Sequence, residues 1–370
     1  MFYKEFKGIK LSTLGMGNMR LPQVDPSNPK SAIDWPEAHK VIDRAYEAGV
    51  NYFDTAYVYN AGESEKCLGA CMKKYPRDSF YLATKFNYGA NPDYKAVFEE
   101  QLERLQTDCI DFYLIHCLMD SNIDNYLNCG CIDYFLEMKK QGKIKYLGFS
   151  SHASVETLEK FADHHDWDFA QLQINYFDWL YNTSKAEYEV LEKRGIKTVV
   201  MEPVRGGKLS NLTDEANAIL KAAHPEWSIS SWALRFVQSL PNVQVILSGM
   251  SNLEQMNDNL NTFSADNALN EEDMATLINA AETWHKNLLV PCTGCCYCTE
   301  GCPMSINIPE WLKVYNAYKT VDSSKGKELA EQISQGGRPE DCVQCGNCTG
   351  HCPQNINTPE IMEKLAELLK

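Results

Sequence analysis

Residues 38–54 read AHKVIDRAYEAGVNYFD, a helical pattern that passes directly into a β-rich apolar run. In its first part, the apolar residues Ala38, Val41, Ile42 and Ala45 recur at the spacing of one helix face. Val50–Phe53 is then short, apolar and rich in residues that favour strands. The stretch therefore predicts a helix followed by a buried strand, which is the basic step of an α/β protein.

The same alternation recurs up to residue 285. Seven further runs of this kind occur at Leu14–Met19, Phe80–Thr84, Phe112–Ile115, Tyr146–Phe149, Ala170–Ile174, Thr198–Met201 and Val243–Leu247. Eight short strands with helices between them predict an α/β fold of the (β/α)8 TIM-barrel type, and residues 1–12 hint at a hairpin that closes its bottom. A doubly wound sheet is the alternative, which the lack of a G-x-G-x-x-G motif after the first strand weakens.

The charge balance excludes two classes of partner. The chain has 370 residues, with 35 Lys and Arg against 50 Asp and Glu, so its net charge is −15. We therefore expect neither nucleic acid nor an anionic membrane as a partner. The sequence contains no apolar run of about 18 residues that would predict a transmembrane helix. Residues 1–15 lack the apolar core of a signal peptide, so we expect a cytoplasmic protein.

The cysteines are concentrated near the C-terminus. Of the 15, nine lie between Cys292 and Cys352, and a cytosolic segment this rich in thiols is typical of metal binding. The segment repeats with a period of 50 residues. Ten residues recur at that offset: Cys292, Cys295, Cys298, Thr299, Cys302, Pro303, Ile306, Asn307, Pro309 and Glu310. We therefore predict a barrel over residues 1–287 and a small second domain over residues 288–370.

Each copy of this repeat reads C-x2-C-x2-C-x3-C-P. The spacing resembles that of bacterial two-cluster ferredoxins, in which the fourth cysteine of each run ligates the other cluster. Zinc sites more often use two C-x-x-C pairs with a longer spacer, so the pattern favours iron–sulfur over zinc. The resemblance implies one 4Fe–4S cluster on Cys292, Cys295, Cys298 and Cys352, and a second on Cys342, Cys345, Cys348 and Cys302. Cys296 has Gly346 as its counterpart and is interpreted as a non-ligand.

The barrel carries a second resemblance, in residues 51–74, NYFDTAYVYNAGESEKCLGACMKK. An Asp at a strand end, a Tyr five residues later and a following G-x-S-E-x-x-L-G resemble the aldo-keto reductases, with Asp54 and Tyr59 in the motif positions. The next strands end LATKF and YLIHC, which places Lys85 and His116 in the family's lysine and histidine positions. Asp54, Lys85 and His116 are each 31 residues apart, as successive βα units predict. All three would lie at the strand ends where barrel active sites form.

The chemistry of carbonyl reduction explains these residue types. Hydride transfer to a carbonyl leaves an alkoxide that needs a proton, and Tyr59 is the expected general acid. A free tyrosine has a pKa of about 10, and a nearby ammonium such as that of Lys85 lowers it. Asp54 is expected to hold Lys85 in place, and His116 to orient the carbonyl oxygen.

The resemblance also implies contacts with a nicotinamide cofactor. Ser150, Ser151 and Gln173 match the residues that hold the carboxamide, although Ser151 replaces the usual Asn. Met201 stands where the family often has an aromatic residue on the nicotinamide. The remaining expected contacts are Gly206 and Gly207 at the pyrophosphate, and Gly249, Ser251, Gln255 and Asn259 at the adenosine end. Because the cations that grip a 2′-phosphate are absent there, either NADPH or NADH remains possible.

Three functions remain open from the sequence. The first is an NAD(P)H-dependent carbonyl reductase with a small carbonyl substrate. The second is an iron–sulfur electron-transfer protein with a redox partner protein. The third is a nicotinamide-binding regulatory subunit. Nicotinamide transfers hydride whereas clusters transfer single electrons, so direct coupling would need a flavin or another one-electron acceptor. The physiological substrate cannot be inferred, because pocket loops vary freely on this scaffold.

Overall fold

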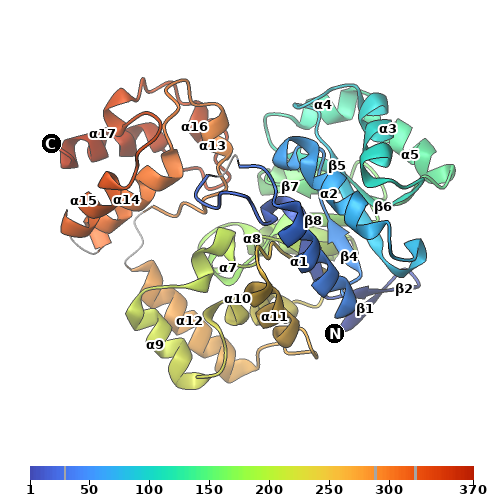
Figure 1. Cartoon of the computed structure of the whole chain (residues 1–370), viewed down its shortest axis with the longest axis horizontal. Coiled ribbons are helices and arrows are strands. Elements are labelled where there is room, and N and C mark those ends of the chain that lie inside the picture. The colour runs from blue at the N-terminus through green and yellow to red at the C-terminus, as the bar shows by residue number, and fades with distance from the viewer. Residues whose placement is uncertain (29–30, 287–289, 321–322) are drawn as a thin grey trace. The chain divides into compact units, whose positions relative to one another are not determined.

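The computed structural model describes residues 1–28, 31–286, 290–320 and 323–370 (Figure 1). The chain divides into two compact units, one of Met1–Val204 with Ser230–Met274, the other of Arg205–Ile229 with Ala275–Lys370. The predicted boundary between residues 287 and 288 lies outside the described residues and stays a prediction. Among the described residues, no helix has both the length and the apolar character needed to cross a membrane.

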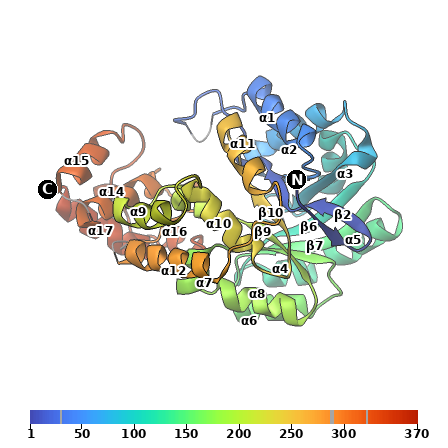
Figure 2. The same cartoon turned by 90° about the horizontal axis from the view of Figure 1, so that it is seen from below.

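The first unit contains the predicted barrel. Eight parallel strands close on one another in the order of the chain: β3 (Leu14–Gly17), β4 (Tyr52–Asp54), β5 (Tyr81–Phe86), β6 (Ile110–Leu118), β7 (Ile144–Ser151), β8 (Phe169–Gln173), β9 (Lys197–Met201) and β10 (Val243–Ser248). Closure through the β10–β3 pair rules out the doubly wound alternative. Helices cover the outer face of the barrel (Figure 2). The strands are almost continuously buried, because side chains also fill the interior of such a barrel.

The predicted N-terminal hairpin is also present. β1 (Tyr3–Phe6) pairs antiparallel with β2 (Ile9–Ser12). Phe6 and Leu11 are buried in one cluster with Tyr52, Phe112 and Phe169, which lie in the N-terminal halves of their strands or at their first residues. The hairpin therefore closes the end of the barrel opposite the carboxyl ends of the strands.

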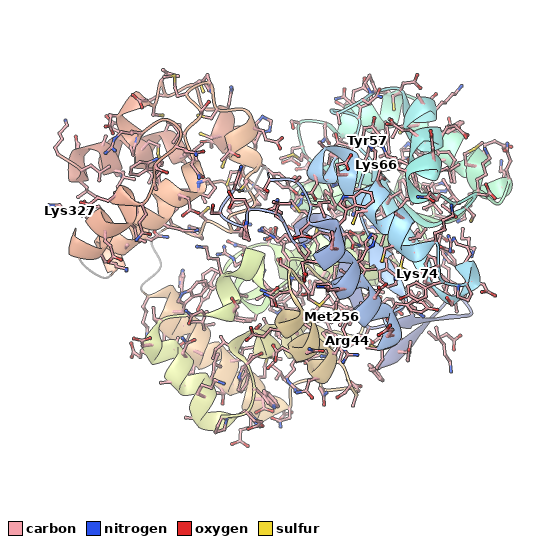
Figure 3. The ribbon with its side chains drawn as sticks, viewed as in Figure 1. Arg44, Tyr57, Lys66, Lys74, Met256 and Lys327 are labelled. Carbon is pink, nitrogen blue, oxygen red and sulfur yellow. The ribbon has the colours of Figure 1, made fainter. Side chains whose placement is uncertain are left out.

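The helices of the first unit follow the expected alternation. Most are α1 (Trp35–Glu47), α2 (Glu63–Met72), α3 (Tyr94–Leu105), α4 (Ile123–Asn128), α5 (Cys131–Lys140), α6 (Val155–Ala162), α7 (Tyr176–Tyr181), α8 (Ser184–Lys193) and α11 (Leu253–Thr262). In α1, the Asp34 side chain accepts a hydrogen bond from the Glu37 backbone N–H and so caps the helix. Arg44 of α1 donates to Asn257 of α11 at 2.9 Å, and Figure 3 shows Arg44 beside Met256 of that helix.

The second unit contains the cysteine repeat. Its helices are α9 (Asp214–Ala223), α13 (Tyr297–Glu300), α14 (Ile308–Thr320), α15 (Ser323–Glu331), α16 (Asn347–Gly350) and α17 (Thr358–Leu368), while α10 (Ile229–Gln238) and α12 (Glu271–His285) contribute to both units. Each cysteine run is followed by a longer helix, α14 in the first copy and α17 in the second. The repeat partners Ile306 and Ile356 are both buried, and Trp311 and Met362 complete the same core. The sequence repeat is therefore also a structural one.

We expect Gly69→Val to lower the free energy of unfolding by about 1–3 kcal/mol or more. A Cβ at Gly69 of α2 would lie 2.5 Å from the Arg104 carbonyl oxygen and 2.8 Å from Leu105 Cα. Because Arg104 and Leu105 end α3, α2 and α3 would have to separate. Chemical denaturation of the protein checks this. Gly89→Val is the matched control, since its nearest neighbour, a flexible Asn87 side chain, would lie at 3.4 Å. Equal stabilities of the two variants would contradict the packing argument.

Candidate active site and iron–sulfur centre

An ammonium group with three acceptors forms the centre of the barrel site. Asp54 ends β4 and Lys85 lies one residue before the end of β5, the neighbouring strand. Lys85 Nζ donates to Asp54 Oδ1 at 2.6 Å, to the Thr55 carbonyl oxygen at 2.6 Å and to the Tyr59 hydroxyl at 3.4 Å. A protonated lysine has three N–H donors, so these partners use all of them. The predicted Asp54, Tyr59 and Lys85 are thus brought together.

Burial and pairing act in opposite directions on this ion pair. The exposed fractions of Lys85 and Asp54 are 0% and 2%. Burial lowers the pKa of Lys85 and raises the pKa of Asp54, while the attraction between the two charges opposes both shifts. The buried carboxylate of Glu65 also favours the charged form of Lys85. The pair therefore keeps a cation beside the Tyr59 hydroxyl. The pKa of this cation, Lys85, is below that of an ordinary lysine.

Tyr59 begins η2 (Tyr59–Gly62), a turn with unusual backbone angles. Asn60 and Ala61 have φ values of 50° and 54°, and Gly62 has 87°. Two consecutive non-glycine residues with left-handed backbone cost energy that the surrounding structure must offset. The turn places the Tyr59 ring under Lys85 Nζ, 4.8 Å from its centroid.

His116, in β6, also lies beside Tyr59. The two rings are arranged edge to face with centroids 5.8 Å apart. Burial, reinforced by the charge of Lys85, holds the pKa of His116 well below its usual value, so the imidazole is neutral. Its Nδ1 atom is buried without a hydrogen-bond partner in the described structure, while its backbone carbonyl accepts from the Tyr126 hydroxyl at 2.6 Å. A neutral imidazole can donate one N–H to a carbonyl oxygen without competing for its proton.

A buried polar network behind Lys85 was not anticipated from the sequence. Gln101 of α3 donates to Glu65, to Thr84 and to the Lys85 carbonyl oxygen at 2.8–3.1 Å, and it accepts from Tyr113. Gln101 is fully buried. A signal existed, because Gln101 lies on the apolar face of the helical pattern at residues 96–105, where a polar residue needs a buried partner.

Arg104 extends this network toward the loop after β4. It donates to Glu65 Oε2 at 3.0 Å and to the Tyr57 carbonyl oxygen at 3.1 Å, and its guanidinium lies 4.4 Å from the Tyr57 ring centroid. The Tyr57 hydroxyl in turn donates to Glu100, and Figure 3 shows Tyr57 close to Lys66 of α2. Glu65, a residue of the G-x-S-E-x-x-L-G motif, therefore holds the loop that contains Tyr59 in place through Arg104.

Four of the predicted nucleotide contacts lie side by side at the carboxyl ends of β7, β8 and β9. Gln173 is in register with Met201, and Ser151 with Leu172. Ser150 Oγ accepts from the Cys117 backbone N–H, and Gln173 Nε2 donates to Asp178. Held in this way, the polar groups face the same end of the barrel as Asp54 and Lys85.

The predicted adenosine-end residues follow β10. The Ser251 backbone N–H donates to Gln255 Oε1 at 2.8 Å, and Asn259 donates to Ser248 Oγ at 2.9 Å. The Ser251 hydroxyl donates to the backbone carbonyl of Arg20, and a Cβ on Gly249 would lie 3.4 Å from the Arg20 side chain. Arg20 was missed because it lies more than 220 residues earlier in the chain. The predicted pyrophosphate contacts, Gly206 and Gly207, belong to the second unit and have φ values of 63° and 90°.

The cysteines of the second unit surround two cavities. The first is lined by Cys292, Cys295, Cys298 and Cys352, and also by Cys296. The second is lined by Cys342, Cys345, Cys348 and Cys302. The fourth cysteine of each run is therefore in the cavity of the other run. Within the described residues, no three His, Cys, Asp or Glu side chains converge to hold a single metal ion. Four thiols around a cavity are the donor set of a 4Fe–4S cluster.

Cys296 is a fifth thiol at the first cavity. It has a φ of 68°, and its counterpart Gly346 has a φ of 77°. The Cys296 sulfur lies 3.4 Å from the Gly294 carbonyl oxygen. The two copies therefore share a left-handed turn, and in the first copy this turn carries a side chain.

The family model of the aldo/keto reductases matches residues 13–282, which is most of the chain. The chain belongs to the aldo/keto reductase family. Residues 291–356 of this reductase match the model of a 4Fe–4S dicluster domain. The protein is thus an oxidoreductase of the NAD(P)H-binding aldo/keto reductase type that also carries two 4Fe–4S clusters.

Known proteins similar to this reductase cover the barrel. The uncharacterized oxidoreductase YqkF of Bacillus subtilis (strain 168) is 26% identical over 71% of this chain and 94% of its own length. Aldo-keto reductase str7 of Strobilurus tenacellus is 30% identical over 54% of this chain and 60% of its own. The holo form of the aldo-keto reductase AKR11C1 from Bacillus halodurans is 25% identical, with a TM-score of 0.62 over 76% of this chain and 96% of its own.

We expect the intact reductase to contain about eight iron and eight sulfide per chain, the sum of two cubane clusters. Cys302→Ser should alter the spectrum of the cluster in the second cavity, and Cys352→Ser that of the cluster in the first, because each side chain lines the cavity of the other run. Metal analysis and EPR of anaerobically purified protein check this. Cys296→Ser is the control and should retain both clusters. Two zinc ions without acid-labile sulfide would contradict the assignment.

Proposed function

We propose that this protein reduces a small carbonyl compound with NAD(P)H in the barrel. The observation that carries the proposal is the Lys85 ammonium, which donates to Asp54, to Thr55 and to the Tyr59 hydroxyl. That arrangement is suited to a proton donor, since a cation beside a phenol stabilises the phenolate left after proton transfer. The bound nicotinamide supplies the hydride.

Each side chain then has one task. Tyr59 delivers its hydroxyl proton to the oxygen on which negative charge develops. Lys85 stabilises the resulting phenolate, and Asp54 keeps Lys85 in place and charged. Neutral His116 donates an N–H to the carbonyl oxygen and orients it. These interactions strengthen as charge develops, so they favour the transition state over the bound substrate.

We infer that Ser150, Ser151 and Gln173 hold the carboxamide of the nicotinamide, with Met201 packed on its ring. A thioether can replace an aromatic ring in such a contact, because it is apolar and polarizable. The alignment of Gln173 and Met201 on adjacent strands supports this. We further propose Gly206 and Gly207 at the pyrophosphate, and Gly249, Ser251, Gln255 and Asn259 at the adenosine end.

We propose the crossed cysteine sets as the cluster ligands, with residues 288–370 as the cluster domain. We also propose a cytoplasmic location, because a segment this rich in cysteines needs reducing conditions to keep its thiols available as ligands.

Electron transfer to a redox partner protein is the second candidate function. It is favoured by the exposure of Cys345, which lines the second cavity, and of its neighbour Val343, whose exposed fraction is 59%. A cluster at that surface could exchange single electrons with another protein. Anaerobic addition of NADPH distinguishes the candidates: reduced clusters seen by EPR would favour electron transfer, whereas carbonyl turnover that is independent of the cluster redox state would favour the reductase alone. Nucleotide binding without either would favour a regulatory subunit.

We expect Tyr59→Phe to lower kcat by about 10²–10⁴-fold while the affinity for the nicotinamide cofactor stays nearly unchanged, because the hydroxyl acts mainly in the transition state. Lys85→Met should have a similar effect, and Asp54→Asn a smaller one, since it acts through Lys85. Steady-state kinetics with a simple aldehyde and cofactor titration by fluorescence check this. His116→Ala should mainly disturb carbonyl orientation.

Tyr57→Phe is the matched control, because its hydroxyl donates to Glu100 rather than to Lys85. It should keep kcat close to that of the parent. A Tyr59→Phe protein that reduces the aldehyde at nearly the parent rate would refute the proton-transfer mechanism, and the electron-transfer and binding functions would then be preferred.

We expect NADPH to be preferred over NADH by at most about tenfold in kcat/KM, because Gln255 stands where an arginine would grip the 2′-phosphate. Arg20→Met should remove most of that preference, since Arg20 is the cation packed against Gly249. Arg44→Met, in the neighbouring helix α1, is the control. A preference of several hundredfold that survives Arg20→Met would contradict this account.

A further inference from the structure

Arg205 is the most deeply buried cation of the second unit. It begins η4 (Arg205–Ser210), and its exposed fraction is 0%. Its Nη2 atom donates to the Pro291 carbonyl oxygen at 3.1 Å and to Gln354 Oε1 at 3.0 Å. A fully buried guanidinium has lost its hydration, so its position is determined by such partners.

One partner lines the first cavity and the other is next to a residue that does. Pro291 directly precedes Cys292, and Gln354 follows Cys352 by two residues and itself lines the cavity. The two segments lie 63 positions apart in the sequence, yet one guanidinium bonds to both. Arg205 therefore fixes a permanent positive charge next to the place where the two runs contribute thiols to one cavity.

The same turn brings a second cation toward this cavity. Lys208 is half-buried, and its charge interacts with Cys292. Glu310 and Lys313 of α14 also act on Lys208, with opposite signs. The first cavity thus has cationic neighbours that are held by the fold.

The second cavity has a different cation near it. Among the described residues, neither cavity is lined by a charged side chain, so the two differ in the cations held beside them. Arg338 precedes Cys342 by four residues, but its side chain is 52% exposed and is paired with Glu340 at 2.8 Å. An exposed, paired arginine is screened by solvent, so it has little influence on a neighbouring cluster. The two cavities are lined by similar sets of thiols, but they differ in the cations next to them.

We propose that Arg205 makes the cluster held by Cys292, Cys295, Cys298 and Cys352 the more easily reduced of the two. Reduction adds one electron from a low-potential donor, makes the cluster more negative by one charge and changes no bond. A buried cation stabilises that added charge. An electron that enters the domain would therefore reside mainly on the first cluster. The proposal rests on the crossed ligand sets proposed above.

The test is a redox titration of the full-length, fully loaded protein with dithionite, followed by EPR. Cys345→Ser identifies the signal of the second cluster. In Arg205→Gln and Arg205→Met, the ratio of reduced to oxidised first cluster at a fixed potential should fall about tenfold or more, while the second cluster changes less than about twofold. Arg205→Lys, which keeps the charge, should stay close to the parent. Arg338→Met is the matched control and should change neither cluster.

Three results would each overturn the proposal. The first is that the redox potentials of both clusters stay unchanged in loaded neutral variants, and the second is that both potentials shift equally. The third is a shift in Arg205→Lys as large as that in Arg205→Gln. If the neutral variants lose iron, Gln354→Glu decides, because a carboxylate within hydrogen-bonding distance neutralises Arg205 in place. An unshifted first cluster in that variant would also overturn it. Fewer than eight irons in the parent would refute the ligand sets, whereas an unshifted potential in a loaded variant refutes only the role of Arg205.

Discussion

The barrel site depends on a charged lysine kept where water cannot reach it. Burial disfavours the charged form of Lys85 and lowers its pKa, and the fold opposes this with one carboxylate, one backbone carbonyl and one phenol. Lys85 and the segments that carry Asp54 and Tyr59 are supported in turn by other buried polar residues. Asn18 binds the Asp54 carbonyl, Gln101 binds the Lys85 carbonyl, and Arg104 binds the loop before Tyr59. The polar network around the barrel core is therefore as necessary to the site as the residues that touch substrate.

This dependence explains why the family motif extends beyond its reactive residues. The Ser64 hydroxyl donates to the Asn18 carbonyl oxygen and is hydrogen-bonded to the Thr55 hydroxyl, and Glu65 accepts from Arg104. Gly69 allows α2 to approach the end of α3 closely enough for these contacts. The G-x-S-E-x-x-L-G motif, which lies at the start of α2, therefore supports the loop that contains Tyr59.

Much of this could be predicted from the sequence, for a physical reason. Strands and the residues at their ends are determined by local patterns. The 31-residue steps from Asp54 to Lys85 to His116 therefore indicated that these residues lie at the same end of neighbouring strands. The cysteine runs could also be recognised from the sequence, because cluster ligation needs a fixed spacing of the cysteines. Contacts between distant segments leave no such pattern. Arg20 beside Gly249 and Arg205 beside Pro291 depend on how the chain returns to itself, and the sequence alone could not place them. The grouping of Arg205–Ile229 with the cysteine repeat was missed for the same reason.

The exchange of the fourth cysteine between the two runs has a consequence during synthesis. A chain that has emerged only as far as residue 341 offers three thiols of its own run to the first cavity and has Cys302 alone for the second. With the proposed ligand sets, the second is complete once Cys348 has been made, and the first only once Cys352 has been made and the second copy has packed on the first. The first centre therefore cannot be loaded before both copies of the repeat have been made, and a chain that stops at residue 350 would lack a proposed ligand of that centre, whose other three thiols lie some fifty residues upstream.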